Sequence, residues 1–206
     1  AAMKIEWIPN AVPAPEIGRT REAMRQALGL KADDLLAVTI GALIPRKRID
    51  FLLEVWDRLR TEPRRIRLAI VGDGPQREEL EGLVRQWGLA EWVRFEGRRQ
   101  DVADWLNAAD LYVHAARAEA CAYSILEALA AGLPVVTTPA GAAREQVADG
   151  ETGWIREMPD TFAEAVRNLT RDDSLRRRMG KASLARWEAQ FTLEKAVEAH
   201  RRIYGG

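Results

Sequence analysis

The chain has 206 residues, which is enough for one large α/β domain or two small ones. Lysine plus arginine equals aspartate plus glutamate at 31 each, and this zero formal net charge argues against a general binder of nucleic acid or of membrane surfaces. The single cysteine, Cys121, excludes an internal disulfide and favours a reducing compartment, and no apolar run approaches the ~20 residues of a membrane span.

The first part of the chain is typical of an extended linker followed by a short helix. Residues 4–8 are predicted to be extended, and three prolines between positions 9 and 15 exclude a helix there. The next residues, 20–28, have helical character and end at Gly29. We therefore interpret residues 1–15 as a linker that leads into the folded domain.

Strands and helices alternate through the rest of the chain. Apolar and β-branched runs predict six strands, over residues 35–41, 66–72, 92–97, 110–114, 134–138 and 154–155. Helical spacing and helix-end signals predict helices over residues 49–60, 75–87, 102–108, 122–131, 161–170, 174–189 and 192–204. Strand–helix–strand units with short connections need parallel pairing. We predict one α/β domain, a Rossmann-like doubly wound parallel sheet of about six strands.

Two carboxylates distinguish the unit that spans residues 110–138. Glu119 lies in the loop where one strand ends, and Glu127 lies eight residues later inside an otherwise apolar helix. Such a helix should be buried on most faces, so Glu127 requires a partner. Ligands of parallel sheets bind at the carboxyl ends of the strands, where Glu119 lies and toward which Glu127 can face.

Charged groups follow other predicted strands at the same edge. Gly41 and the run Arg46–Arg48 follow the first strand, Gly97–Arg99 follow the third, and Glu145 follows the fifth. Cations and the start of helix 122–131 suit a phosphate or diphosphate. Carboxylates suit sugar hydroxyls, which donate hydrogen bonds to them. The edge therefore has the composition of a nucleotide-sugar site.

Each of these signals also has an ordinary structural explanation. The cation run can be a solvated loop, and Glu127 can be an ion-pair partner. The turn Gly72–Pro75 lacks the G-x-G-x-x-G fingerprint and is typical of a plain turn. His114 is typical of a packing residue at a strand end, and Cys121 of a small buried side chain. No His/Cys cluster has metal-ligand spacing, so we expect no metal and no cofactor.

Eight short motifs occur in order along the chain: Ile8–Asn10, Gly41–Lys47, Val71–Pro75, Phe95–Gly97, Ala109–Asp110, Glu119–Glu127, Gly132–Val136 and Gly150–Trp154. In this order they resemble the carboxy-terminal domain of group 1 retaining glycosyltransferases with the GT-B fold. The resemblance covers nearly the whole chain, from about Lys4 to Tyr204. Its hallmark is the pair of glutamates eight residues apart, here Glu119 and Glu127.

The resemblance implies a glycosyltransferase that moves a sugar from a UDP-, GDP- or ADP-sugar to an acceptor. The chain would be the donor-binding half, and the acceptor would bind to an amino-terminal domain that is missing here. The linker 1–15 and the final helix 190–206 would be the two crossings between the domains. We therefore expect a donor domain, excised or separately encoded, with little activity alone. We expect the chain to be cytoplasmic. In the full-length protein, the missing domain would bring it to the membrane surface and to a membrane-associated acceptor. We expect no nucleic-acid partner.

The resemblance also implies roles for single residues. Glu119 would contact donor sugar hydroxyls, Glu127 would hold the ribose, and Lys47 would neutralise the departing diphosphate. No residue is assigned as catalytic, although Lys47 and Glu119 would assist, and Glu145 would lie in a loop that lines the sugar pocket. The segment 97–99 would flank the base, and the helix start would meet the diphosphate or the sugar. The other donor-binding residues are Gly41, Arg46, Gly97, Arg98, Arg99, Ala122, Tyr123 and Ser124.

Two departures from the family pattern support other readings. Ala42 stands where the family usually has arginine, so a diphosphate loses a main cation unless Arg46 or Arg48 substitutes. Ala120–Ala122 replaces a Gly-Phe-Gly segment, and the added methyl groups narrow the backbone's approach to the sugar. Both departures motivate an alternative, a non-catalytic GT-B-like interaction module that has lost donor binding. A third hypothesis, an epimerase of UDP-sugars, ranks last because the chain has only two histidines.

Overall fold

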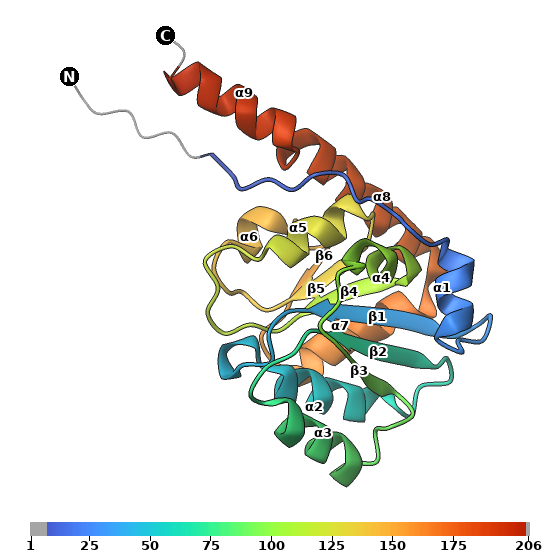
Figure 1. The fold of residues 1–206 in the computed structure, drawn as a ribbon. Coiled ribbons are helices and arrows are strands. Elements are labelled where there is room, and N and C mark those ends of the chain that lie inside the picture. Colours follow the sequence, from blue (N-terminus) through green and yellow to red (C-terminus); the bar gives the residue numbers. More distant parts are fainter. Residues whose placement is uncertain (1–7, 205–206) are drawn as a thin grey trace.

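A six-stranded, all-parallel sheet forms the centre of the molecule in the computed structural model, which describes residues 8–204 (Figure 1). The strand order is β3-β2-β1-β4-β5-β6. The strands are β1 (Leu35–Ile40), β2 (Ile66–Val71), β3 (Val93–Gly97), β4 (Leu111–His114), β5 (Val135–Thr137) and β6 (Gly153–Ile155). The prediction of a doubly wound sheet of about six strands is therefore confirmed. The predicted extended segment 4–8 lies outside the described residues except for its last position.

Every predicted helix of the described chain is present, with ends that differ by a few residues. The helices are α1 (Arg21–Ala27), α2 (Ile49–Leu59), α3 (Arg77–Gln86), α4 (Val102–Ala108), α5 (Tyr123–Ala130), α6 (Ala143–Gln146), α7 (Pro159–Arg171), α8 (Asp173–Gln190) and α9 (Leu193–Tyr204), with a 3-10 turn η1 (Pro45–Lys47). One predicted boundary is wrong, because Pro75 does not begin α3. A turn, in which Arg77 N donates to Gly74 O at 3.1 Å, comes first.

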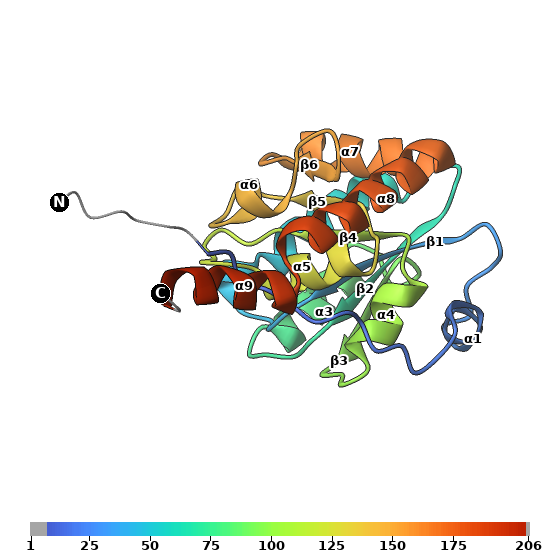
Figure 2. The same cartoon turned by 90° about the horizontal axis from the view of Figure 1, so that it is seen from above.

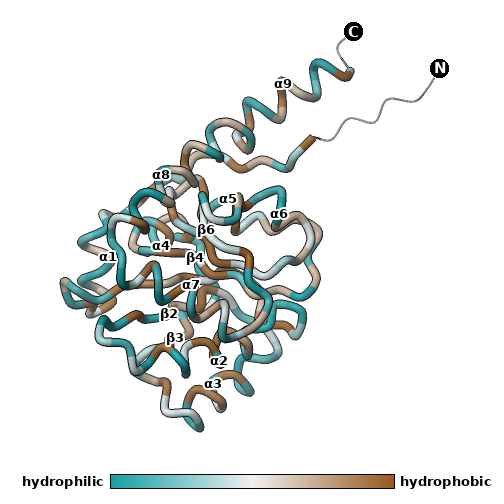
Figure 3. Tube along the Cα trace, turned by 180° about the vertical axis from the view of Figure 1, so that it is seen from behind, coloured by the Kyte–Doolittle hydropathy of each residue, from teal (hydrophilic) through white to brown (hydrophobic). Residues whose placement is uncertain are grey.

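Helices cover both faces of the sheet. Figures 1 and 2 show α2, α3 and α7 on one face, and α4, α5 and α8 on the other. Because both faces are covered, the strands are apolar almost throughout, as the brown central segments in Figure 3 show. All of β1 except Ile40 is buried, and Trp56 and Trp105 fill the two faces of the core.

The strand order reverses between β1 and β4. From β1 the chain winds outward through β2 and β3, and it then returns to lay β4 against the other side of β1. Loops that follow β1 and β4 therefore leave in opposite directions and open a crevice at the carboxyl ends of these strands. Ligands of open parallel sheets bind at such a switch point.

The first described residues run beside the junction of α8 and α9. Val12 N donates to Phe191 O at 3.0 Å, and Trp187 Nε1 donates to Val12 O at 3.3 Å. Beyond this junction α9 has no buried residue and leaves the body of the domain (Figures 1 and 2). Its apolar side chains Leu193 and Val197 are exposed. Within residues 8–204, no helix is long and apolar enough to cross a membrane.

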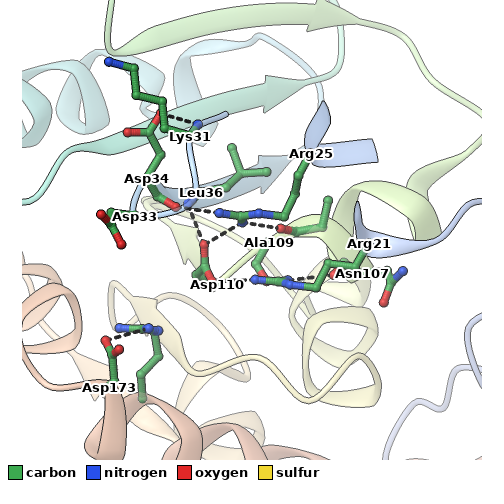
Figure 4. Close-up of polar contacts among 12 residues, drawn as sticks. Arg21, Arg25, Lys31, Asp33, Asp34, Leu36, Asn107, Ala109, Asp110 and Asp173 are labelled. Atoms are coloured by element: carbon green, nitrogen blue, oxygen red, sulfur yellow. Dashed lines mark hydrogen bonds and ion pairs between the residues drawn. The ribbon is translucent and has the colours of Figure 1, made fainter. Parts of the chain in front are cut away.

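A buried carboxylate ties α1 to the amino ends of the central strands. Asp110, which directly precedes β4, accepts from Arg21 Nη2 at 2.6 Å, Arg25 Nη1 at 3.0 Å and Leu36 N at 2.8 Å (Figure 4). Its side chain is 9% exposed. A buried carboxylate needs such partners, and here they join α1, β1 and the start of β4.

Replacing Asp110 with asparagine should therefore destabilise the fold. Asp110→Asn leaves two arginines around a neutral group, and we expect a loss of about 3 kcal/mol in the free energy of unfolding. Urea unfolding followed by circular dichroism measures this loss. Asp160→Asn is the control, because that side chain is 85% exposed in its pair with Arg58 and should change stability by less than about 1 kcal/mol. Equal losses in the two variants would contradict this prediction.

Candidate functional site

An ion pair joins the loops that follow β1 and β4. The Lys47 Nζ atom, at the end of η1, pairs with Glu119 Oε2, and Arg46 Nη1 lies 3.6 Å from Glu119 Oε1. The side chains of Lys47 and Glu119 are only 14% and 13% exposed. The loops are also joined through their backbones, because Arg117 N donates to Arg46 O at 2.8 Å. The structure therefore brings together Arg46, Lys47 and Glu119 at the switch point.

Gly41 lies directly beneath this pair. A Cβ atom built on Gly41 would lie 3.6 Å from Lys47 Cε, so the lysine stem rests on the glycine backbone. The first residue after β1 is thus in contact with the cation that follows it in η1. This contact places Gly41 and Lys47 in one site.

The Glu119 loop is held from the other side by the segment after β5. Gly141 has φ +54°, and a Cβ atom there would overlap the Glu119 carbonyl oxygen. Glycine is therefore required for the close approach of the two loops. Ala142 N donates to Ala120 O at 3.1 Å and fixes their register.

The start of α5 faces this site without a cap of its own. Ala122 is the N-cap residue, and within residues 8–204 no side chain accepts from the first-turn N–H groups. The side chain of Tyr123 is 53% exposed, whereas Ser124 is half-buried. Uncapped N–H groups at a helix start attract anions. Ala122, Tyr123 and Ser124 thus lie at the positions that the sequence predicted for a helix-start anion site.

Glu127 lines a separate part of the crevice. A cavity of about 340 Å³ is lined by Glu127, by the segment 13–16, by Gln100 before α4 and by residues of α4 such as Val102. No described residue forms a hydrogen bond or ion pair with the Glu127 carboxylate, so the partner that the sequence predicted is not a residue of the described chain. Desolvation instead raises the pKa of Glu127. The carboxylate is left with its hydrogen-bonding capacity unused.

An adjoining cavity of about 460 Å³ contains Gly41, Ala42, Arg98, Arg99 and Val102. Val102 lines both cavities, so they are neighbours over the start of α4. The neighbouring backbone is fixed by Gly97 O, which accepts from Gly72 N at 2.8 Å.

Arg98 and Arg99 differ in whether their guanidinium groups already form an ion pair. Arg99 already donates to both oxygens of Asp101, at 2.8 and 2.7 Å, and its guanidinium lies 5.9 Å from the centre of the Trp105 ring. Arg98 is exposed and lines the same cavity. Of the two, Arg98 is therefore the side chain without a competing ion pair.

Two predicted residues lie away from the crevice. The Arg48 guanidinium lies 4.5 Å from the centre of the Phe51 ring and lines a different cavity with Arg117. Arg48 therefore faces away from Glu119, whereas Arg46 faces it. Glu145 is exposed and lines neither of the two crevice cavities.

Sequence reasoning missed the buried hydroxyl of Tyr112 on β4, whereas its interpretation of His114 as a packing residue at a strand end is confirmed. The Tyr112 hydroxyl lies 3.4 Å from Ile40 N, and burial raises the pKa of Tyr112, with the charges of Glu127 and Glu119 adding to this effect. His114 is 3% exposed, and its Nε2 atom has no hydrogen-bond partner in the described chain. Burial, followed by the charge of Lys47, lowers the pKa of His114 to about 4. The only sequence signal for the Tyr112 hydroxyl was a polar aromatic residue in an apolar strand.

Metal-ligating side chains do not gather in this part of the chain. Across residues 8–204, no group of three or more His, Cys, Asp or Glu side chains is arranged to hold a metal ion. The charged groups of the crevice instead include the cations Arg46, Lys47, Arg98 and Arg99 and the carboxylates Glu119 and Glu127, beside the start of α5. This set can hold an anion beside a group that carries hydroxyls.

Comparisons of the sequence agree with one family. The profile described as Glycosyl transferases group 1 matches residues 20–186. The lipopolysaccharide core biosynthesis glycosyltransferase LpsE of Rhizobium meliloti is 30% identical over 188 residues, which cover 90% of this chain and 54% of LpsE. The D-inositol 3-phosphate glycosyltransferase of Streptomyces coelicolor is 33% identical over 208 residues, covering 94% of this chain and 45% of that protein. The chain thus spans about half the length of the curated relatives it matches.

Comparisons of the structure give the same picture for the fold. The crystal structure of Anabaena HepE in complex with UDP and glucose superposes with a TM-score of 0.87 at 22% identity, over 97% of this chain and 56% of HepE. The crystal structure of WaaG, a glycosyltransferase involved in lipopolysaccharide biosynthesis, gives a TM-score of 0.81 at 28% identity, over 97% and 56% of the two chains. The sheet and its helices therefore match about half of each of these two chains.

The buried His114 should make stability depend on pH. The folded protein keeps this imidazole neutral down to about pH 4, whereas the unfolded chain protonates it near its ordinary pKa of 6.5. The unfolded state thus binds more protons in this window, so stability is complete above about pH 6.5 and falls by about 3 kcal/mol as the pH drops to 4. We expect His114→Leu to reduce this fall. Urea unfolding at several pH values measures it.

The control for this prediction is His200→Gln, because His200 is exposed on α9. That variant should retain the pH dependence of the wild-type protein. The interpretation fails if His114→Leu and the wild-type protein lose stability equally between pH 6.5 and pH 4.

Proposed function

The chain belongs to the group 1 glycosyltransferases, and we propose that it is the half of such an enzyme that binds the nucleoside diphosphate sugar. Its sheet matches the carboxy-terminal half of the GT-B fold. One observation carries the proposal: Lys47, Glu119 and the uncapped start of α5 meet at the switch point, with Glu127 unpaired in the cavity beside them. We assign the anion to the cations and the helix start, and the hydroxyls on its two sides to the two carboxylates.

The diphosphate is assigned to the cations and the helix start. Lys47 supplies a point charge, Arg46 lies beside it, and the first N–H groups of α5 supply donors. The position of Arg46 supports its use in place of the arginine that is absent at Ala42. Both cations now face Glu119, so a bound diphosphate must compete with this carboxylate for them.

That competition suggests how the sugar is recognised. When the diphosphate takes over Lys47, the Glu119 carboxylate is released and can accept hydrogen bonds from sugar hydroxyls. Its two oxygens otherwise face Lys47 and Arg46. The exchange keeps a buried charge paired in both states, which avoids the cost of an isolated one.

The nucleoside is assigned to the two neighbouring cavities. Glu127 accepts from the ribose hydroxyls, since no described residue occupies its oxygens. Arg98 and Arg99 flank the base from the cavity that also contains Gly41, and Gly97 directly precedes them in the chain. HepE was crystallised with UDP and glucose, so uridine nucleotides are the first ligands to test, followed by GDP and ADP.

The chemical step follows from these assignments. The bond between the sugar's anomeric carbon and the diphosphate oxygen breaks, and its electron pair stays on the diphosphate. Lys47 and the α5 start stabilise that developing charge. The acceptor hydroxyl forms the new bond to the anomeric carbon and gives its proton to the departing diphosphate oxygen, with retention of configuration. We assign no residue of this chain as the base.

The acceptor is assigned to a further domain of a longer protein. Support comes from the half-length coverage of the relatives and from the exposed apolar side chains of α9, which include Leu193, Val197 and Ile203. We propose that α9 and the linker, residues 1–15, contact that domain. Without it the acceptor is not held and water is not excluded, so this chain alone should turn over slowly. Relatives named for lipopolysaccharide synthesis favour a membrane-associated acceptor.

A second candidate is an interaction module that keeps the fold but binds no donor. The alanine at position 42 and the alanines of the 120–122 loop favour it, because they remove a cation and narrow the approach to the backbone. This candidate predicts no nucleotide binding even at millimolar concentration. The titrations below separate it from the first proposal.

Loss of either charged group should weaken nucleotide binding. We expect Lys47→Ala and Glu127→Ala each to lower the affinity for the best of UDP, GDP and ADP by about tenfold or more, since a charge-assisted contact contributes roughly 1.5–3 kcal/mol. Isothermal titration calorimetry measures the affinities. Lys181→Ala and Glu164→Ala are matched controls, because both side chains are exposed on helices outside the crevice. Binding that survives both Lys47→Ala and Glu127→Ala unchanged would refute the site.

Glu119→Gln should separate diphosphate from sugar recognition. The neutral amide no longer competes for Lys47, so UDP affinity should rise by about threefold to tenfold. The gain should be absent for UDP-glucose, because the sugar hydroxyls lose a charged acceptor. Calorimetry with both ligands measures the ratio, and Glu151→Gln, at an exposed turn, is the control. A parallel change for both ligands would contradict the assigned exchange.

A further inference from the structure

Gln146, the last residue of α6, holds the loop that carries Glu119. Its Nε2 atom donates to Ala122 O at 2.9 Å and contacts Cys121 Sγ at 3.3 Å. The residue is 2% exposed. Together with the Ala142 N–H, which binds Ala120 O, it fixes three consecutive residues of this loop.

The short helix α6 is itself fixed from behind by α8. Arg186 donates through Nε to Gln146 O at 2.9 Å and through Nη2 to Glu145 O at 2.7 Å. A helix of four residues does not persist by its own hydrogen bonds, so this contact is needed to hold its position. The position of the Gln146 side chain is thus set by a neighbouring helix and passed to the loop.

Stability does not account for a glutamine here. Its Oε1 atom is buried, and no described group donates to it, which costs the folded state. The acceptor that Gln146 satisfies, Ala122 O, also accepts from Ile125 N at 3.0 Å, so it stays paired without the glutamine. An unbranched apolar side chain of the same length would therefore serve the fold equally well or better.

We propose that Gln146 is a positioning residue that sets the place of residues 120–122 against the donor sugar. This inference rests on the proposed function. It assigns to Gln146 an effect on the affinity for the nucleotide sugar and not on the affinity for the nucleotide alone. It acts through Ala122 and Cys121. Because alanines at 120 and 122 leave little room above the backbone, a small shift of the loop changes the space for the sugar.

The test compares Gln146→Met with the wild-type chain in two calorimetric titrations. We expect UDP affinity to change by less than about twofold and UDP-glucose affinity to fall by about tenfold, with no loss of thermal stability. A merely structural role would lower both affinities together. The control is Gln86→Met, an exposed position on α3.

Cys121 provides a second readout, because it is the only cysteine in the sequence. In the wild-type protein we expect slow alkylation by iodoacetamide, slowed further by UDP-glucose. Gln146→Met removes the contact to Sγ and should raise the rate several-fold, whereas Gln86→Met should not change it.

Three results would overturn the inference. One is an equal loss of UDP and UDP-glucose affinity in Gln146→Met, and another is no change in affinity or alkylation rate. The third is a wild-type chain that binds neither ligand, which also refutes the proposed function. If neither ligand binds but Gln146→Met still speeds the alkylation of Cys121, then Gln146 does hold the loop, and the error lies in the proposed donor site.

Discussion

The ion pair between Lys47 and Glu119 is the interaction on which the crevice depends. It joins the loop after β1 to the loop after β4, and these are the two loops that diverge at the reversal of strand order. A backbone hydrogen bond from Arg117 N to Arg46 O at 2.8 Å joins the same two loops. The ion pair closes the floor of the crevice and places a cation, a carboxylate and the start of α5 side by side.

The carboxylates at the two edges of the sheet differ in whether they are paired. At the amino edge Asp110 accepts from two arginines and a backbone N–H, and its charge is used up in holding α1 to the sheet. At the carboxyl edge Glu127 has no partner in the described chain, and the first N–H groups of α5 have no cap. Unused polar groups reduce stability, so an unpaired carboxylate beside an uncapped helix start is the physical mark of a binding site.

Much of this arrangement could be predicted because parallel strands impose simple rules. Strands buried on both faces must be apolar, so β1 and β2 were recognisable, and groups that follow such strands must share an edge, so Lys47 and Glu119 could be grouped. The differences between prediction and structure have physical reasons as well. Pro75 satisfied a helix-start rule, but the turn before α3 took two more residues. Glu127 was expected to be paired because its helix is apolar, yet a cavity beside that helix leaves its carboxylate partly accessible.

The sequence by itself determined the order of the strands and helices along the chain, the parallel pairing of the strands and the edge of the sheet at which the charged residues gather. These follow from local patterns of burial and chain direction. Only the tertiary structure decided which partners meet. Lys47 and Glu119 are 72 residues apart, Arg46 turns toward that pair while Arg48 turns onto Phe51, and Gln146 reaches the loop at 122. Side-chain direction in loops depends on the packing of distant segments against each other, and that information is absent from any single stretch of sequence.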